Sequence, residues 1–460
     1  MKEKVDLILK NGIIITSDQK NTVYSNGGLA VQGSKIVAID KSHVIEERYQ
    51  AEEVIDAHGQ IVMPGLIDTH VHSGQQFLRG NLSYLIKNKN YRMKAPGWKT
   101  YLIPFESCLS ESDMNLSATA TYVNMIKVGT TCFAEHGGPY PDEMAKAIMK
   151  TGIRGIIAKS TFDMNDEGLP ANVRNTTKSA ISENVNLVRN WHKKADGRIR
   201  GSLSCRQIIM CSLELFKEFA RLAEELDVIV ETHFAEGAYE IDYCIQHYGK
   251  RTTEILNDIG FLSPRVLAAH SAQLSKNEVQ LFKAKDVKVA HCPSGNFAMF
   301  GSPKVPYMME NGIVIGIGSD GGGWGSLDLF KEMKISKTCQ LSHFGAPYLD
   351  QALVQDEDLV NMATINGAKA IRWQDEIGSL EVGKKADLIV LGSDSLHTIP
   401  CPDPYFAVVN LLTGNDVKTT IVNGKVVMKD KVLQTVDEEK LKDSINERVP
   451  KIMEKFSKFW

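Results

Sequence analysis

The central part of the chain is patterned in short, almost uninterrupted apolar runs, each followed by polar residues and then by a longer segment of mixed character. Near-continuous apolar runs are typical of strands in a parallel sheet that is buried on both faces. In the longer segments, apolar residues recur at three- and four-residue spacing, which predicts helices. The clearest predicted helices are 113–128, 213–226 and 277–285. The strand-like runs are 61–67, 129–134, 153–158, 199–204, 228–232, 265–269, 287–290 and 313–318.

Strands that alternate with helices predict βα units and a parallel sheet. Eight such units are the number found in a closed (β/α)8 TIM-like barrel. We therefore expect an α/β protein with a metal-dependent catalytic barrel over residues 61–375.

The two ends of the chain have a different pattern, in which short alternating runs are punctuated by turn residues. The runs lie at 5–9, 12–15, 27–31, 35–39 and 386–391, and the turn signals at Asn11-Gly12, Gly33-Ser34 and Asn423-Gly424. This pattern favours antiparallel strands. We expect both termini, 1–60 with 376–432, to form one small β-sandwich domain. The charged stretch that follows predicts a C-terminal helix within 433–460.

Composition excludes several classes of protein. The chain has 460 residues, of which 43% are hydrophobic, and a net charge of −3. No basic cluster with interleaved aromatic residues suggests nucleic acid as a partner, and no run of about 18 apolar residues predicts a membrane span. The eight cysteines show no short paired spacing, and the first residues lack a signal-peptide pattern. We expect a cytoplasmic protein with reduced thiols.

Residues able to bind a metal follow the predicted strands. His70 and His72 are two positions apart and therefore point to the same side of a strand. Further strand-like runs end at His233, His270 and Asp320. In a (β/α)8 barrel, reactive groups lie at the carboxyl ends of the strands. Imidazole and carboxylate groups bind zinc or iron, and a catalytic site leaves one position open. The two histidines alone are a weak signal, and ordinary core or surface histidines are the alternative.

Jointly and in order, five segments make the chain resemble the amidohydrolase superfamily. The resemblance is to the heterocycle aminohydrolases, the group with methylthioadenosine/S-adenosylhomocysteine deaminases and atrazine chlorohydrolases. The segments lie at 65–72, 232–236, 268–270, 291–296 and 318–321, and the similarity extends to 378–389. They are specific for the superfamily and much less specific for the substrate.

The resemblance implies that His70, His72, His233 and Asp320 bind the metal. Two-metal relatives add a lysine at the end of the fourth strand, which this chain lacks at 202–207. We therefore expect one divalent ion, most simply Zn²⁺, with Fe²⁺ as the second choice. His291 is expected to support the site without binding the ion, and His136 to lie near the pocket.

The expected chemistry is hydrolytic deamination. A divalent ion lowers the pKa of a bound water toward about 7. Asp320 is expected to accept the water proton, Glu236 to carry a proton to the ring nitrogen, and His270 to stabilise developing charge. A helix-capping ion pair is the alternative role for Glu236, and a satisfied core position is the alternative for His270.

The residues expected to bind substrate give mixed signals. Gln75 and Arg206 resemble residues of guanine deaminases, which favours oxopurine- or pterin-like rings. Glu106 resembles the ribose-binding glutamate of adenosine-type enzymes. Trp324, in a glycine-rich loop, is expected to stack on a flat ring. Segment 81–98 is expected to form either a solvated loop or a lid over the site. In the alternative interpretation, Arg206 is held by a carboxylate such as Glu106 or Glu135 and does not meet substrate.

Other functions stay open at this stage. An s-triazine chlorohydrolase or aminohydrolase would use nearly the same residues, and a cyclic-amide hydrolase would need the missing lysine. A non-enzymatic scaffold is the remaining class. The expected partner is a small heterocyclic molecule, with neither nucleic acid nor membrane, and similarity alone suggests a homodimer. The sequence leaves the natural substrate and the metal undetermined.

Overall fold

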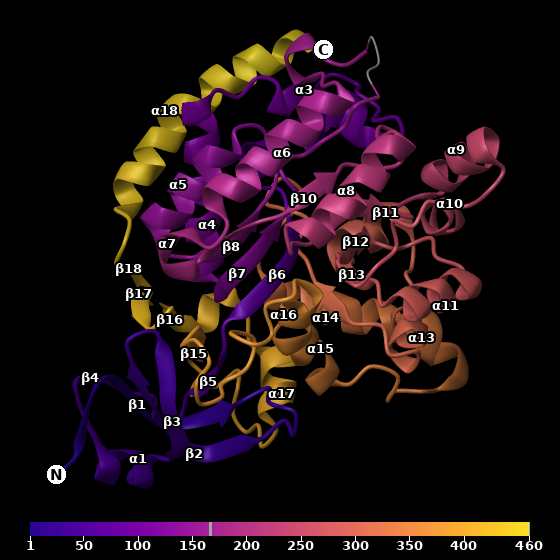
Figure 1. The fold of residues 1–460 in the computed structure, drawn as a ribbon. Coiled ribbons are helices and arrows are strands. Elements are labelled where there is room, and N and C mark those ends of the chain that lie inside the picture. Colours follow the sequence, from indigo (N-terminus) through magenta and orange to yellow (C-terminus); the bar gives the residue numbers. More distant parts are fainter. Residues whose placement is uncertain (165–167, 460) are drawn as a thin grey trace.

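The computed structural model describes residues 1–164 and 168–459. Its centre consists of short parallel strands surrounded by helices (Figure 1). One four-stranded sheet has the order β6 (Leu66–Val71), β7 (Thr130–Glu135), β8 (Arg154–Ile157) and β9 (Ile199–Gly201). A five-stranded sheet has the order β10 (Leu203–Cys205), β11 (Val230–Phe234), β12 (Val266–His270), β13 (Lys288–His291) and β14 (Ile315–Ile317). Every predicted strand run of the central region therefore contains a strand, and the predicted α/β class is confirmed.

The two central sheets approach each other at both edges. Ser202 alone separates β9 from β10, so one stretch of chain passes from the first sheet to the second. At the other edge, the Asp320 amide donates to the His70 carbonyl at 3.0 Å. Because β14 has three residues and ends before this point, no ladder joins β14 to β6 among the described residues. Strand pairing therefore does not establish the predicted closed barrel.

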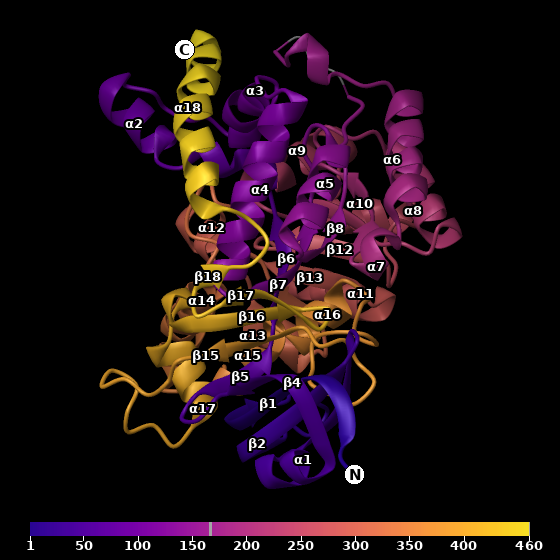
Figure 2. The same ribbon diagram turned by 90° about the vertical axis from the view of Figure 1, so that its left-hand side faces the viewer.

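Helices cover the outside of these sheets (Figures 1 and 2). The predictions at 113–128, 213–226 and 277–285 are confirmed by α4 (Glu111–Lys127), α8 (Leu213–Glu225) and α11 (Lys276–Lys285). A serine side chain caps the first turn of each of these helices and satisfies a free backbone N–H. The other helices of more than ten residues in this region are α5 (Pro141–Thr151), α6 (Thr177–Trp191), α9 (Ala238–Tyr248) and α14 (Leu329–Gln340). Shorter ones are α1 (Ser42–Arg48), α2 (Asn81–Asn88), α3 (Ile103–Glu106), α7 (Lys194–Gly197), α10 (Thr252–Asp258), α12 (Pro293–Gly295), α13 (Val305–Glu310), α15 (Asp356–Met362), α16 (Ile365–Ala370) and α17 (Pro404–Phe406).

Both ends of the chain contribute to one nine-stranded sheet. Its strands are β1 (Glu3–Ile15), β2 (Val23–Gln32), β3 (Lys35–Lys41), β4 (Tyr49–Asp56), β5 (Ile61–Pro64), β15 (Leu388–Leu391), β16 (Val417–Val422), β17 (Lys425–Lys429) and β18 (Val432–Leu433). The hairpins expected at Gly33-Ser34 and Asn423-Gly424 are present. The strands pair as a single sheet, so the predicted β-sandwich is not confirmed.

Two details of this sheet differ from the expectation. Asn11-Gly12 is not a turn, because β1 continues through it with a register shift between Leu9 and Gly12. Asn11 has a φ of 61°, which accommodates the irregularity within the strand. The apolar run 61–67 divides at Gly65. Its first part, β5, pairs with β1 and β15, and its second part continues as β6 in the central sheet. The division into 1–60, 61–375 and 376–432 stays a prediction.

A buried ion pair joins the terminal sheet to the central strands. Arg154 on β8 donates from Nε to Asp387 Oδ2 at 2.7 Å and from a terminal nitrogen to Asp387 Oδ1 at 3.1 Å. The same guanidinium donates to Asn423 Oδ1 at 3.2 Å, and it lies 5.1 Å from the ring of Trp373. This two-pronged geometry fixes distance and orientation together.

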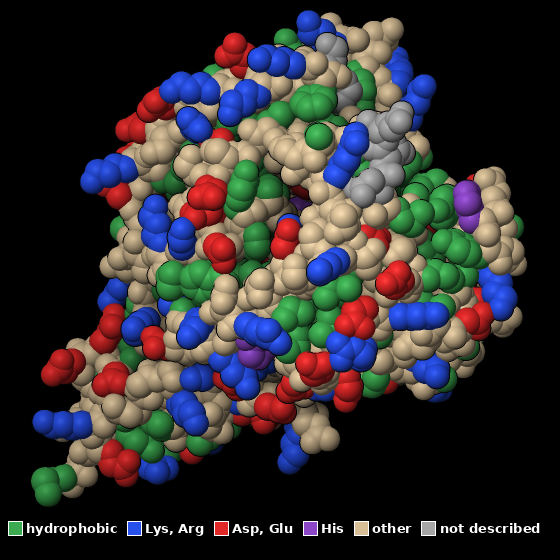
Figure 3. All heavy atoms as spheres, turned by 45° about the horizontal axis from the view of Figure 1, so that its top comes forward, with side chains coloured by type: hydrophobic (Ala, Val, Ile, Leu, Met, Phe, Trp, Pro, Cys, Tyr) green, Lys and Arg blue, Asp and Glu red, His purple; other side chains and the backbone are tan. Residues whose placement is uncertain are grey.

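Helix α18 (Glu438–Phe456) lies within the predicted range 433–460, whose last residue is outside the described part of the chain. It runs beside α4 (Figure 2). Lys127 pairs with Glu438 at 2.7 Å, and Arg448 pairs with Asp113. Among the described helices, none combines the length and apolar character needed to cross a bilayer. On the face drawn in Figure 3, basic and acidic side chains are interspersed.

Candidate metal centre and substrate cavity

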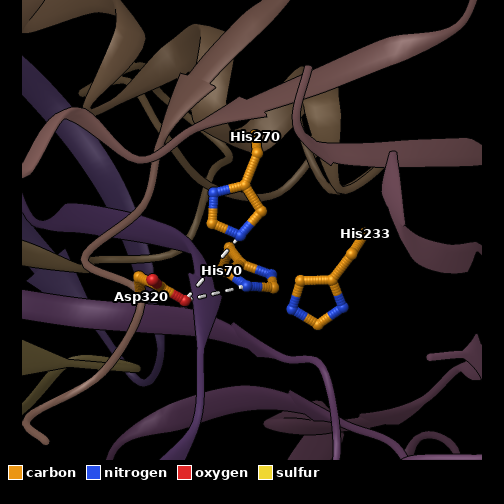
Figure 4. A group of neighbouring side chains, drawn as sticks. All are labelled: His70, His233, His270 and Asp320. Atoms are coloured by element: carbon orange, nitrogen blue, oxygen red, sulfur yellow. Dashed lines mark ion pairs between the residues drawn. The ribbon is translucent and has the colours of Figure 1, made fainter. Parts of the chain in front are cut away.

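The four predicted metal ligands converge at the carboxyl ends of the central strands. His70 and His72 come from the end of β6, His233 from β11, and Asp320 follows β14. Asp320 Oδ1 lies 3.4 Å from His70 Nε2 and 3.7 Å from His72 Nε2. The Nε2 atoms of His72 and His233 are 3.3 Å apart. Figure 4 shows the side chains of His70, His233 and Asp320 directed toward one point.

The other ring nitrogens determine which atoms face this point. His70 Nδ1 lies 2.5 Å from Glu231 Oε1, and His233 Nδ1 lies 2.8 Å from the carbonyl oxygen of Arg206. Each acceptor fixes the proton on Nδ1, which leaves the lone pair of Nε2 directed at the centre. His70 Nε2 is buried and has no hydrogen-bond partner. Buried polar atoms normally have partners, so this nitrogen indicates a missing ligand.

The spacing of these atoms fits a metal ion. Tetrahedral zinc with bonds of about 2.0–2.1 Å separates its ligand atoms by roughly 3.3–3.4 Å. The separations of 3.3, 3.4 and 3.7 Å lie at or slightly above that value. His270 Nε2 is also near, at 3.9 Å from Asp320 Oδ1. Together with His70, His233 and Asp320, it forms a group whose ligand atoms all lie within 4.8 Å of one another. His72 Nε2 is not in that group, but it lies closer to Asp320 Oδ1, at 3.7 Å, than His270 Nε2 does.

The charge states of His72, His233 and Asp320 also suit metal binding. Burial of His70 is outweighed by its hydrogen bonds to Asp320 and Glu231, which raise its pKa to about 10, so this imidazole would lose a proton on binding an ion. Burial lowers the pKa of His72 and His233 well below the usual value, so both imidazoles are neutral near pH 7. Burial opposes ionisation of Asp320, but the neighbouring histidines outweigh it and lower the pKa of this carboxyl to about 2. Neutral imidazole and ionised carboxylate are the forms that coordinate a metal.

Glu236 lies beside this group with one carboxylate oxygen held and the other free. Gln207 Nε2 donates to Glu236 Oε2 at 2.7 Å, and the Tyr239 hydroxyl donates to the same oxygen. Glu236 Oε1 faces His270 Nε2 at 3.7 Å. Burial raises the pKa of Glu236 to about 7. A carboxyl with this pKa exchanges protons readily at neutral pH.

His270 is held from behind by a chain of polar groups. Its Nδ1 lies 3.0 Å from Asn296 Oδ1, and Asn296 Nδ2 lies 3.1 Å from His291 Nδ1. His291 is therefore placed behind His270, as expected for a supporting residue.

The ring of His136 lies behind His233, with centroids 4.1 Å apart. His270 and Asp320 both have positive φ, 67° and 61°, a strained conformation that is commonly found at functional sites.

A cavity of about 460 Å³ opens onto the metal-ligand group. Arg206 and Trp324, two of the residues expected to bind substrate, line it, as do Glu236 and Asp320. Residues 93–95, 97 and 98 of the expected lid line it as well. Glu106 instead lines an adjacent cavity of about 440 Å³, and Gln75 is buried behind Glu106.

Arg206 is paired, as in the alternative interpretation. Its guanidinium donates to Glu106 Oε2 at 3.0 Å and to Ser160 Oγ at 2.9 Å. Gln75 Nε2 donates to Glu106 Oε1 at 2.8 Å. Three of the four expected substrate-binding residues thus form one buried chain. Arg206 Nε has no partner and remains a donor for a ligand.

The sequence analysis missed several buried groups around the site. Glu231 supports His70, and its position two residues before His233 on β11 was a usable signal, because both side chains point to the same side. Asp68 accepts from Ser319 Oγ at 2.6 Å and ties the end of β6 to the Asp320 loop. Glu135 accepts from the Ser73 amide at 3.0 Å. No periodicity in the sequence identified Asp68, Glu135 or Gln207.

Comparison with known proteins places this site in a family. The amidohydrolase family model matches residues 61–427. A 5-methylthioadenosine/S-adenosylhomocysteine deaminase of Thermoanaerobacter pseudethanolicus is 30% identical over 98% of this chain and 100% of its own length. A 5'-deoxyadenosine deaminase of Methanosarcina acetivorans is 33% identical, covering 95% of this chain and 96% of its own. The chain belongs to the amidohydrolase family, whose deaminases are hydrolases acting on C–N bonds.

Solved structures share the fold. A zinc-bound adenosine deaminase from Xanthomonas campestris has a TM-score of 0.89 at 22% identity, covering 98% of this chain and 100% of that one. A zinc-bound atrazine chlorohydrolase from Arthrobacter aurescens TC1 has a TM-score of 0.82 at 22% identity, covering 96% and 100%. At this identity, the likeness describes the fold and leaves the substrate to be argued from the site.

Proposed function

We propose that the protein is a metal-dependent hydrolytic deaminase that converts the amino group of a purine-type nucleoside to a carbonyl and releases ammonia. The observation that carries the proposal is the group of three imidazole nitrogens and one carboxylate oxygen beside a buried carboxyl, Glu236, with a pKa of about 7. We also propose that strands β6 to β14 form a closed (β/α)8 barrel.

The donor set suits one divalent ion, with His70, His72, His233 and Asp320 as ligands. Three nitrogens and one oxygen fit zinc, and iron is the second choice. When bound, the ion would supply Lewis acidity and an activated water. The fourth predicted strand, 199–204, is divided into β9 and β10; β10 ends in Cys205, which is followed by Arg206, and offers no lysine to bridge a second ion.

The protein's own groups would move the protons. Asp320 is ionised, so it could take a proton from a water activated at the ion. Glu236 presents Oε1 toward the centre, and in its protonated form it would donate to the ring nitrogen as the ring carbon becomes tetrahedral. The proton taken by Asp320 would pass to the exocyclic nitrogen, so that the C–N bond breaks and ammonia leaves, and the remaining hydroxyl proton would return to Glu236 as the carbonyl forms. His270 is positioned to stabilise the negative charge that develops on oxygen.

The cavities favour a substrate larger than a bare ring. The first cavity, of about 460 Å³, has Trp324 in its wall and lies next to the metal group. Arg206 contacts Glu106 and Ser160, which line the second cavity of about 440 Å³. A ring in the first cavity would direct a sugar and its 5' substituent toward the second. Relatives named for 5-methylthioadenosine, S-adenosylhomocysteine and 5'-deoxyadenosine support this class of substrate.

Pairing of Arg206 with Glu106 weakens the argument for oxopurines and pterins. That argument required an unpaired guanidinium seeking a carbonyl or anion, whereas the charge of Arg206 is balanced by Glu106 at 3.0 Å. We therefore place 5'-substituted adenosines ahead of guanine-like rings and triazines.

Ammonia release by protein of known metal content tests this proposal. The substrates are 5'-methylthioadenosine, S-adenosylhomocysteine, 5'-deoxyadenosine, guanine, a pterin and atrazine. We expect turnover of the adenosines, and loss of turnover in Asp320→Asn. Preference for guanine or the pterin would overturn the substrate assignment, and chloride release from atrazine alone would overturn deamination.

A further inference from the structure

The side chain of Gln207 lies between the wall segment 93–98 and the carboxyl of Glu236. Its Oε1 accepts from Trp98 Nε1 at 3.0 Å. Its Nε2 donates to Glu236 Oε2 at 2.7 Å and to Glu240 Oε2 at 2.9 Å. Gln207 is completely buried, directly after Arg206 at the end of the fourth predicted strand. No role in the deamination argued above has yet been given to this amide.

The orientation of this amide is determined by its partners. The indole N–H of Trp98 can only donate, so it requires the amide oxygen. The two carboxylates on the other side require the amide nitrogen. A rotation of the amide by 180° would place two donors against each other and an acceptor against carboxylates. Gln207 therefore has one favourable orientation, in which Trp98 holds the amide oxygen and the two carboxylates hold the amide nitrogen.

Trp98 and Leu85 anchor a segment whose other residues are exposed or half-buried. Trp98 is 6% exposed. The basic residues that precede it, Lys87, Lys89, Arg92 and Lys94, are all exposed. Between them and Trp98, the segment contributes Met93, Ala95 and Gly97 to the cavity wall. The Trp98–Gln207 hydrogen bond thus joins the cavity wall to the interior at the position of Glu236.

Glu240 holds the other side of this network. Its carboxylate accepts from the amides of Ala235 and Glu236 at 2.9 and 3.0 Å. Thr252 Oγ1 also donates to it, at 2.8 Å. The backbone of Glu236 is therefore fixed, and the remaining freedom lies in its side chain, which Gln207 and Tyr239 orient.

We propose that Gln207 is a positioning residue that latches segment 81–98 over the cavity through Trp98 and, through the same amide, orients Glu236 for proton transfer. Closing of the segment and alignment of the proton carrier are then one event. This inference rests on the proposed function for the role of Glu236, but the latch itself is independent of the substrate.

Three variants test separately the contact between segment 81–98 and Gln207 and the orientation of Glu236 by its hydrogen-bond donors. Trp98→Phe removes the donor and keeps the ring, and Gln207→Met removes the amide at similar volume. Tyr239→Phe removes a hydroxyl that donates to Glu236 and accepts from Gln207 Nε2 at 3.1 Å, while the Trp98–Gln207 hydrogen bond is left in place. Gln340→Met, at a buried glutamine whose side chain donates to the Pro303 carbonyl, is the matched control. Each variant is purified with its metal content measured.

Two readouts are compared. Trypsin cleavage at the basic residues of segment 81–98 reports opening of the segment, and kcat for 5'-methylthioadenosine deamination reports alignment of Glu236. We expect Trp98→Phe and Gln207→Met each to accelerate cleavage and to lower kcat, by roughly fivefold or more for one buried hydrogen bond. The double variant should be no worse than the more severe single variant, because both break the same contact. Tyr239→Phe should lower kcat without changing cleavage, and Gln340→Met should change neither.

The coupling would be refuted if Trp98→Phe accelerated cleavage with unchanged kcat, or if the two single variants added independently. Unchanged cleavage in both Trp98→Phe and Gln207→Met would refute the latch. Absence of turnover in the unaltered protein would contradict the proposed function. The comparison of trypsin cleavage rates would then still test the latch.

Discussion

Hydrogen bonds from neighbouring groups fix the orientation of single side chains in the candidate site. Glu231 selects the ring nitrogen that His70 presents, and the Arg206 carbonyl does the same for His233. For Glu236, Gln207 and Tyr239 hold one oxygen and leave Oε1 toward the centre. At this scale the chemistry depends on which atom is free, and hydrogen bonds determine that choice.

A change of Glu236 to Gln should retain the metal and lose most turnover. The amide keeps the shape and the hydrogen-bonding capacity of the side chain but cannot carry a proton, and positioned proton transfer contributes about 10² to 10⁴ in rate. Steady-state deamination and elemental analysis on the same preparation measure both quantities. The exposed Glu254→Gln serves as the control. Turnover within tenfold of the unaltered protein would contradict the role of Glu236.

Residue-level reasoning from the sequence located the atoms nearest the metal and missed their supports. His70 and His72 were predictable because a spacing of two puts both rings on one side of a strand. Asp68 and Glu135 lie in apolar surroundings where the pattern gives no reason to expect a carboxylate. Their partners, the backbone amides of Ser319 and Ser73, exist only once the strand ends have come together.

Helices and strands position the residues of the site, and the ends of β10 and α3 show this most clearly. Arg206 follows β10 and Glu106 ends α3, so their ion pair joins two elements across the boundary of the two cavities. Both side chains are almost fully buried, at 1% and 6% exposure. A buried charge left without its partner is costly, while the intact pair contributes little net stability.

Arg206→Ala should therefore lower the free energy of unfolding by about 3–5 kcal/mol, since Glu106 would keep an unpaired buried charge. Arg206→Met combined with Glu106→Leu should recover part of this loss. Denaturant unfolding measures both, with Arg221→Met in an exposed ion pair as the control that should change little. If Arg206→Ala left the order of substrate preference unchanged, Arg206 would support the structure of the site without contacting substrate. A selective loss of oxo-substituted rings would restore it as a substrate contact.

The sequence of β10 also predicts the number of metal ions bound by each chain. Because β10 and the residues after it carry no lysine, we expect about one transition-metal ion per chain in purified protein. Elemental analysis with protein quantified by amino-acid composition measures the ratio. Removal with a chelator followed by titration with zinc should restore activity at one equivalent. A ratio close to two would contradict a single-ion centre.

Prediction at the scale of elements succeeded for strand existence and for two of the three turn signals, and it missed that one apolar run is divided between two sheets. Apolar runs placed all the central strands, because burial on both faces leaves a strong sequence pattern. The run 61–67 carries the same pattern although β5 and β6 belong to different sheets. The division falls at Gly65, where an added side chain would meet Thr131. Local periodicity does not reveal such a contact, because the two residues are far apart in the sequence.

At the scale of the whole molecule, the terminal sheet and the central strands are connected by the Arg154–Asp387 pair and by the continuity of β5 with β6. Both partners of the pair are buried, and the geometry is two-pronged. This arrangement predicts that the two parts unfold together, since neither retains a satisfied charge without the other.

Arg154→Met tests this connection. We expect a loss of about 3–5 kcal/mol, because Asp387 remains buried without its partner, and a second unfolding transition where the unaltered protein shows one. Calorimetry and denaturant unfolding followed by two probes measure the change. Arg200→Met, next to the same Trp373 ring but paired with the half-exposed Glu376, is the comparison. A single undisturbed transition in Arg154→Met would show that other contacts carry the coupling.

The position of β5 in the terminal sheet has a consequence for biosynthesis. This strand lies between β1 and β15, and β15 follows it by more than three hundred residues. During translation, the edge of β5 that later pairs with β15 is therefore left with unpaired N–H and C=O groups until almost the entire chain has been made. An open strand edge is a template for pairing with other chains, and closing so long a loop is slow. The nascent protein should depend on chaperones for this interval, and expression at reduced temperature should raise the yield of folded chain more than an added stabilising ligand does.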